Sequence, residues 1–172
     1  MPGPTRLTAE VAPSDGPTAA ARVSLRQGVG FRVGRVQRRL RAAWAARIAD
    51  LDLAPPQAAV LRALGERPGL GVRAVAREIG TDPMNVKHIA DALEARGLLA
   101  SQLDPSDRRT RCLRLSPVGS DLCEAVDQLA QLHERWLRDL LGEAPYARLG
   151  QALDNLETRL SGVDGTEGRD GD

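Results

Sequence analysis

Aromatic side chains are scarce in this 172-residue chain, and their scarcity limits the core that it can build. Phe, Trp and Tyr together make up 2% of the residues, whereas hydrophobic residues of all kinds make up 42%. Leu, Val, Ile and Ala must therefore fill most of the interior. The length fits one domain with flexible ends, since domains usually run to about 100–200 residues.

Cysteine and histidine are also rare, with two of each. Cys112 and Cys123 are too few for a disulfide framework and lack the spacing of a zinc site. The two histidines are far apart in sequence, so the chain offers no metal site. We expect inert thiols in preference to a redox sensor, and Cys112 should point outward because it alternates with the core-facing Leu113 and Leu115.

The sequence contains no long apolar run and no catalytic motif. No stretch approaches the roughly 20 apolar residues that span a bilayer, and the N-terminus lacks the apolar segment of a secretion signal. These features predict a cytoplasmic protein. A Gly-rich phosphate loop, paired carboxylates and a Ser/His/Asp arrangement are all missing. We therefore expect neither an enzyme nor a bound cofactor.

The charges are balanced overall but unevenly distributed. The net charge is +1. Residues 1–50 carry nine basic residues against three acids, residues 51–115 carry ten against eight, and residues 116–172 carry five against twelve. Binding to phosphate needs local positive potential and does not need a basic average. The distribution therefore permits contact with nucleic acid.

Hydrophobic periodicity divides the chain into five segments. Residues 1–22 and 161–172 are rich in Gly, Ala, Pro or acid, and we expect both to be mobile tails. Helical spacing dominates between them and predicts a mostly α fold of the α+β class. Residues 23–52 read as one long helix. Residues 53–116 read as short helices followed by a hairpin, and residues 117–160 as two further helices.

A short helix within the third segment carries the main functional indication. Asp82 is a suitable N-cap with Pro83 at the first helical position. An apolar inner face at Val86, Ala90 and Leu93 leaves the other face for solvent. That outer face contains Met84, Asn85, Lys87 and His88.

The hairpin that follows has a charged tip. Asp104–Arg109 separates two short apolar-polar stretches, and Arg108, Arg109 and Arg111 lie at or near the tip. These arginines are poorly suited to core packing but are typical of a loop that inserts beside phosphates or into a narrow minor groove. A protruding helix beside such a loop would contact adjacent grooves of duplex DNA.

Residues 53–119 resemble the MarR family of winged-helix regulators. The resemblance rests on four stretches in the family's order and spacing: Leu53–Leu61 (LAPPQAAVL), Asp91–Leu99 (DALEARGLL), Asp104–Arg109 (DPSDRR) and Leu115–Gly119 (LSPVG). The flanking helices extend the likeness to residues 24–160. The resemblance implies a winged helix-turn-helix whose flanking long helices form a dimerisation lobe.

The resemblance also implies roles for individual residues. Asn85, Lys87 and His88 would lie on the DNA side of the recognition helix, where Asn suits adenine and Lys suits guanine or phosphate. Met84 differs from the small hydroxyl residues common in the family, so base preference cannot be transferred. In the wing, Asp107 would orient Arg109 into the minor groove. Arg73 and Arg77 on the preceding helix are candidate phosphate contacts or simple surface charges.

These features predict a homodimeric repressor that binds double-stranded DNA at an inverted-repeat operator and responds to a small-molecule effector. The family's effector pocket lies between the DNA-binding lobe and the dimer helices, and Trp44, His133 and Trp136 are its candidates here. Packing in the dimer core is the alternative for these side chains. The alternative function is a winged-helix adaptor for proteins that no longer binds DNA. A methyltransferase fragment would need a cofactor-binding βα unit, for which no room remains after residue 115.

Overall fold

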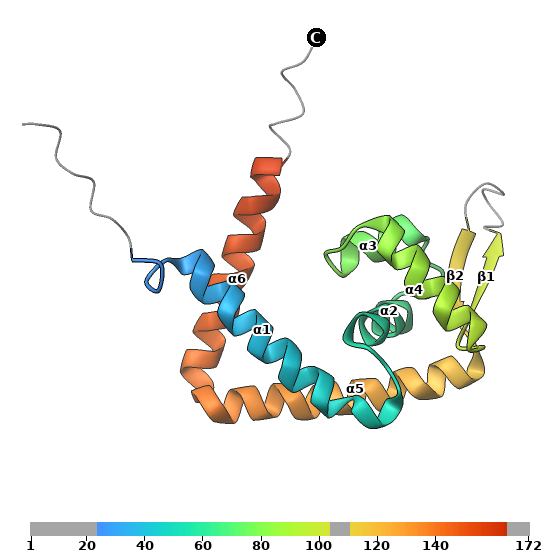
Figure 1. Cartoon of the computed structure of the whole chain (residues 1–172), viewed down its shortest axis with the longest axis horizontal. Coiled ribbons are helices and arrows are strands. Elements are labelled where there is room, and N and C mark those ends of the chain that lie inside the picture. Colours follow the sequence, from blue (N-terminus) through green and yellow to red (C-terminus); the bar gives the residue numbers. More distant parts are fainter. Residues whose placement is uncertain (1–23, 104–110, 165–172) are drawn as a thin grey trace, which may run out of the picture. The chain divides into compact units, whose positions relative to one another are not determined.

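The computed structural model describes residues 24–103 and 111–164, and it divides the chain into two compact units at Arg39–Leu40. In chain order the elements are α1 (Val29–Arg47), the 3-10 turn η1 (Ala49–Leu51), α2 (Pro55–Glu66), α3 (Val72–Glu78), α4 (Pro83–Ala95), β1 (Leu99–Leu103), β2 (Arg111–Leu115), α5 (Pro117–Leu141) and α6 (Glu143–Asp164) (Figure 1). The mostly α fold with a small β part is thereby confirmed. The proposed tails fall almost wholly outside the described residues.

The first unit contributes a turn and the beginning of α1. The backbone N–H of Gln27 donates to the Ser24 carbonyl at 2.8 Å just before the helix begins. Val29, Val33 and Val36 follow helical spacing, as the sequence predicts, and each is exposed. The long first helix expected over residues 23–52 is shorter, because α1 ends at Arg47 and a 3-10 turn completes the segment.

The second unit holds the hydrophobic core. Helix α2 begins with Pro55 and Pro56, where a missing N–H costs no hydrogen bond, and the Gln57 Oε1 accepts from the Ala54 N–H at 2.9 Å. Its inner face packs with α3, α4 and the start of α5. The fully buried large side chains are all aliphatic: Ile48, Leu61, Leu64, Leu93, Leu113, Val60, Val75, Val86 and Val126.

Strands β1 and β2 form an antiparallel pair in which Leu99 faces Leu115 and Leu103 faces Arg111. The Leu113 N–H also donates to the Leu70 carbonyl at 2.9 Å, so a loop segment lies along the other edge of β2. Gly71 forms a bridge with Cys112 at this edge. Cys112 is buried, and the expected outward orientation is therefore wrong. The expectation rested only on alternation with Leu113 and Leu115, which gives no sign of the segment that pairs with the other edge of β2.

Helices α5 and α6 meet at Gly142, whose φ of +82° suits a residue without a side chain. Figure 1 shows α5 passing below α2 before the chain turns into α6. The Ser116 Oγ caps α5 by accepting from the Gly119 N–H at 3.0 Å. Helix α6 continues past the predicted end at Leu160. The Ser161 hydroxyl donates to the Glu157 carbonyl at 3.0 Å, which satisfies this polar residue within the helix.

Candidate nucleic-acid interface

Helix α4 is fixed at its start by a side-chain cap. The Asp82 Oδ1 accepts from the Asn85 backbone N–H at 2.8 Å, and Pro83 occupies the first helical position. Both features were predicted from the sequence. Val86, Ala90 and Leu93 are buried against the core, so the orientation of the helix is set by its apolar face.

The opposite face of α4 presents its polar side chains to solvent. Met84 is 60% exposed, and Asn85, Lys87 and His88 are also exposed. Two of these side chains are held in place. The Asn85 Nδ2 donates to the Thr81 Oγ1 at 3.1 Å, and the Lys87 Nζ lies 2.8 Å from the Asp91 Oδ2. The structure thus groups the four α4 residues singled out in the sequence on one accessible surface.

Helix α3 precedes α4 and contributes two cations. Arg73 and Arg77 are exposed, four residues apart and therefore on one side of the helix. Val75 and Ala76 are buried and face the core. Gly71 is the N-cap of α3 and offers no side-chain cap. The backbone N–H groups of Ala74 and Val75 donate to the Gly71 carbonyl at 2.9 and 3.0 Å.

The wing predictions are only partly within the described structure. Arg111 begins β2 opposite Leu103, and its side chain is not among the described ones. Asp107, Arg108 and Arg109 lie outside the described residues. Their roles remain predictions from the sequence. The strands on either side do place the base of the hairpin directly after α4.

The three effector-pocket candidates lie together in the second unit. The His133 ring centroid is 5.6 Å from that of Trp44 and 5.2 Å from that of Trp136. The Arg47 guanidinium lies 5.9 Å from the Trp136 ring centroid. His133 is 8% exposed, and among the described residues its Nδ1 has no hydrogen-bond partner. Burial, and secondarily the Arg47 charge, lowers the pKa of His133 from its ordinary value.

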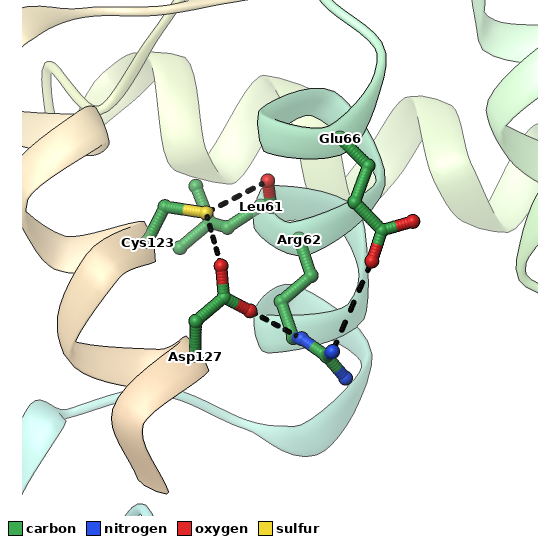
Figure 2. A network of polar contacts seen from close by, with 5 residues as sticks. All are labelled: Leu61, Arg62, Glu66, Cys123 and Asp127. Carbon is green, nitrogen blue, oxygen red and sulfur yellow. Dashed lines mark hydrogen bonds and ion pairs between the residues drawn. The ribbon is translucent and has the colours of Figure 1, made fainter. Parts of the chain in front are cut away.

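Sequence reasoning missed a polar network between α2 and α5. The Arg62 Nε donates to the Asp127 Oδ1 at 2.6 Å, and the other Asp127 oxygen lies 3.9 Å from the Cys123 Sγ (Figure 2). The thiol also donates to the Leu61 carbonyl at 3.4 Å. Burial first, and the Asp127 charge second, raise the pKa of Cys123 to about 11. A thiol with this pKa is a poor nucleophile at neutral pH, as expected for an inert cysteine.

A second set of contacts joins α5 to α6. The Tyr146 hydroxyl donates to the Glu134 Oε2 at 2.5 Å, and the Arg138 guanidinium lies 4.8 Å from the Tyr146 ring centroid. The Arg138 Nε is 3.4 Å from the Glu143 Oε2. The spacing of Glu134 and Arg138, one helical turn apart, was the available sequence signal. Their partners on α6 could not be inferred from it.

Within the described ranges, no helix is both long enough and apolar enough to cross a membrane. The same residues contain no group of three or more His, Cys, Asp or Glu side chains arranged to hold a metal ion.

Comparison with known proteins identifies several relatives. The family model described as "MarR family" matches residues 53–110. The transcriptional regulator HosA of Escherichia coli O111:H- is 30% identical over 93 residues, covering 54% of this chain and 69% of HosA. The segments matched in curated relatives span 58% and 69% of those proteins' own lengths.

Two solved structures are similar over most of their length. The transcriptional repressor CouR bound to a 23-mer DNA duplex is 31% identical, with a TM-score of 0.72, over 77% of this chain and 94% of CouR. BpsR of Bordetella bronchiseptica, from work on regulation of its DNA binding by 6-hydroxynicotinic acid, is 27% identical. Its TM-score is 0.73, over 83% of this chain and 98% of BpsR.

Proposed function

The chain belongs to the MarR family of transcriptional regulators, and on this premise we propose that it represses transcription by binding duplex DNA as a homodimer. The observation that carries the proposal is the exposed polar face of α4 opposite a buried apolar face. A helix presented in this way fits the major groove, which is wide enough to admit it. The similar repressor CouR was solved on a DNA duplex.

We assign the contacts according to the chemistry of each side chain. On α4, Asn85 is suited to reading adenine and Lys87 to guanine or phosphate, while His88 can donate to either a base or a phosphate. The remaining contacts would be nonspecific or made by the wing. In this proposal, Met84 packs at the groove edge. Phosphate or minor-groove contacts come from Arg73, Arg77, Arg108, Arg109 and Arg111, with Asp107 orienting Arg109.

The homodimer is supported by apolar surface that a lone chain leaves exposed. On α6, Leu149, Leu153, Leu156 and Leu160 recur at helical spacing and are 41–54% exposed. A stripe of this kind marks an interaction surface. Two-fold pairing would place two α4 helices about 34–36 Å apart, one turn of DNA, so the operator should be an inverted repeat.

The effector site in this proposal is the aromatic cluster of Trp44, His133 and Trp136. Its rings provide stacking surfaces, and the buried His133 Nδ1, which has no hydrogen-bond partner among the described residues, is a polar group that a ligand inserted here would satisfy. BpsR, which is similar in structure, is described as regulated by 6-hydroxynicotinic acid. An effector shifts DNA occupancy only if it favours one spacing of the two DNA-binding lobes over another.

One observation favours a second candidate. Residues 116–172 carry twelve acids and five basic residues, which would suit an adaptor that binds proteins and no longer binds DNA. An adaptor would ignore polyanions even at low salt. A repressor would bind DNA with an affinity that falls steeply as salt rises. Because a repressor acts on the genome, we place the protein in the cytoplasm.

Selection of bound sequences from a random duplex pool tests the proposal directly. We expect an inverted repeat with half-sites about one helical turn apart. The mass of the complex with the selected duplex should correspond to two chains per duplex. Failure to enrich any sequence, together with no binding to bulk DNA at low salt, would contradict the proposal and favour the adaptor.

A further inference from the structure

We propose that Thr81 is a positioning residue for DNA recognition, because it holds the side chain of Asn85 in place before DNA is bound and so strengthens the preference of α4 for adenine. The inference rests on the proposed function, since it concerns how the same helix reads its operator. Its basis is a hydrogen bond of 3.1 Å from the Asn85 Nδ2 to the Thr81 Oγ1. In this role Thr81 acts through Asn85 and does not itself touch the DNA.

The backbone of Thr81 is fixed by the turn between α3 and α4. Gly80 follows the C-cap of α3 and has a φ of +65°, the left-handed conformation that commonly ends a helix. The Thr81 N–H donates to the Ala76 carbonyl at 2.9 Å, a hydrogen bond that belongs to the same helix-ending motif. Asp82, the next residue, is the N-cap of α4. Thr81 is therefore attached to the end of one helix and to the start of the other.

The side chain of Thr81 is suited to hold a neighbour. Its branched Cβ restricts rotation about χ1, and the residue is half-buried. Asn85 lies four positions later, and a side chain on a helix leans toward the N-terminus of that helix, which brings the amide back toward Thr81. The Asn85 backbone N–H is held as well, because it donates to the Asp82 Oδ1 at 2.8 Å. Asn85 is thus fixed at its backbone and at its side chain.

The contact with Thr81 leaves the Asn85 amide able to pair with a base. The amide has two N–H groups and an oxygen acceptor, and only one N–H is donated to Thr81. The other N–H and the oxygen have no hydrogen-bond partner among the described residues. A donor beside an acceptor is what adenine requires at its N7 and N6. Asn85 is also the third residue of α4, and residues near the N-terminus of a recognition helix are those that reach base edges.

Holding Asn85 before binding should affect adenine more than the other bases. A free asparagine loses rotational freedom when it forms two hydrogen bonds to a base, and this loss weakens binding. When Thr81 holds the amide, part of the loss has already occurred in the unbound chain. Adenine is the base that presents an acceptor beside a donor in the major groove. The contact should therefore raise selectivity for adenine without raising the affinity for bulk DNA.

Two other roles for the Thr81 hydroxyl make different predictions. A direct contact between the hydroxyl and a phosphate would strengthen binding to every sequence equally. A purely structural role would change the stability of the fold. The positioning role alone changes the discrimination between bases at one position of each half-site.

Gel shifts test the proposal with two forms of the selected operator. One has adenine at the position where Asn85→Ala abolishes the preference, and the other has guanine there in both half-sites. Thr81→Val keeps the branched shape and removes the hydroxyl. It should lower the affinity for the adenine duplex about threefold per half-site, and so about tenfold overall. The affinity for the guanine duplex should not change, and neither should the slope of log affinity against log salt concentration, because no charge is lost.

Three further variants serve as controls for the gel shifts. Thr81→Ser retains a hydroxyl and should recover most of the preference for adenine. Thr81→Val should have no further effect when it is combined with Asn85→Ala, because its action requires the amide. Thr158→Val, which makes the same substitution at an exposed position of α6, should bind both duplexes as the wild type does.

A second measurement needs no DNA. NMR relaxation of the Asn85 side-chain amide reports its mobility in the unbound chain. We expect a restricted amide in the wild type and a more mobile one in Thr81→Val. Asn155 is the other asparagine of the chain and provides the reference, because its Nδ2 donates to the Gln151 carbonyl at 2.8 Å and should be unaffected.

Three results would overturn the proposal: an equal loss of affinity for the two duplexes in Thr81→Val, an unchanged preference for adenine in that variant, or an Asn85 amide that is equally mobile with and without the Thr81 hydroxyl. The unfolding midpoint of each variant separates lost recognition from lost folding, and Thr81→Ala is the second hydroxyl-free variant. All three results leave the repressor proposal standing. Failure of the wild type to enrich any sequence would instead overturn the repressor proposal, and this one with it.

Discussion

Arg62 and Asp127 join α2 to α5 across 65 positions of sequence, with the Arg62 Nε 2.6 Å from the Asp127 Oδ1. Both side chains are 41% exposed, so solvent screens their attraction and the pair adds little stability by itself. Its importance is that the same carboxylate faces a buried thiol. The pair therefore connects a surface contact to the chemistry of Cys123.

Asp127→Asn should lower the pKa of Cys123 from about 11 while leaving it above the ordinary 9.0. Burial is the larger cause of the raised pKa and remains in the variant, whereas the repulsion by the carboxylate is removed. The pH dependence of iodoacetamide alkylation, followed at Cys123 by peptide mass spectrometry, measures this shift. Asp139→Asn removes an exposed charge elsewhere on α5 and should change nothing. An unshifted alkylation curve in Asp127→Asn would contradict the assignment.

The stability of the protein should fall as pH drops below about 6.5, partly because of His133. Its pKa in the folded chain is below the ordinary 6.5, so the unfolded chain takes up a proton that the folded chain resists. The free energy of unfolding is then greatest above pH 6.5 and declines as the pH falls toward the folded pKa. Urea unfolding at several pH values measures the decline.

His133→Gln should flatten this decline, and the exposed His88→Gln should preserve it. These two are the only histidines of the chain, which makes them a matched pair. The same slope in His133→Gln as in the wild type would show that other groups control the pH dependence.

Replacement of the α4 polar groups should weaken binding to the selected operator. Asn85→Ala or Lys87→Ala should cost on the order of 1–3 kcal/mol if the side chain reads a base. If Lys87 contacts phosphate, Lys87→Ala should weaken binding to all sequences. The slope of log affinity against log salt concentration should then become shallower by about one. Gel shifts measure both effects, with Asn155→Ala on α6 as the control. Full affinity in both variants would show that Asn85 and Lys87 of α4 do not recognise the operator.

Gly119→Ala should destabilise the fold by roughly 1–3 kcal/mol, a typical cost of overpacking. A Cβ at this position would overlap the Leu98 carbonyl oxygen, which also accepts from the Ser116 N–H at 3.0 Å. Gly150→Ala is the control, because a Cβ there meets nothing within 4 Å. It should stabilise α6 by about 0.5–1 kcal/mol. Chemical unfolding measures both, and equal stability of the two variants would contradict the packing argument.

The elements that the sequence predicts well are those with local causes. Asp82 and Pro83 define the start of α4 because capping depends on neighbouring residues, and the structure confirms both. The buried and exposed faces of α4 follow from helical periodicity in the same way. The grouping of the α4 polar residues on one surface was therefore predictable, whereas the bases they would contact were not.

The features that the sequence did not predict depend on distant contacts. Cys112 is buried, and the segment at Leu70 and Gly71 pairs with the free edge of its strand. Alternation within a strand carries no information about such neighbours. The ion pair of Arg62 with Asp127 depends on the packing of α2 on α5. The spacing of Arg62 and Glu66, one turn apart, indicated a charged helix face but gave no sign of its partner.

Helix α5 contains 25 residues without interruption, which corresponds to a rod of roughly 37 Å. Near one end, Gly119 has no side chain, which lets the helix lie directly against the Leu98 carbonyl. The other end makes the contacts to α6. A tilt of about 5° in such a rod moves its far end by about 3 Å, close to the rise of one base pair, about 3.4 Å. Small angular adjustments at the α6 end would thus be magnified at the end nearest β1 and β2.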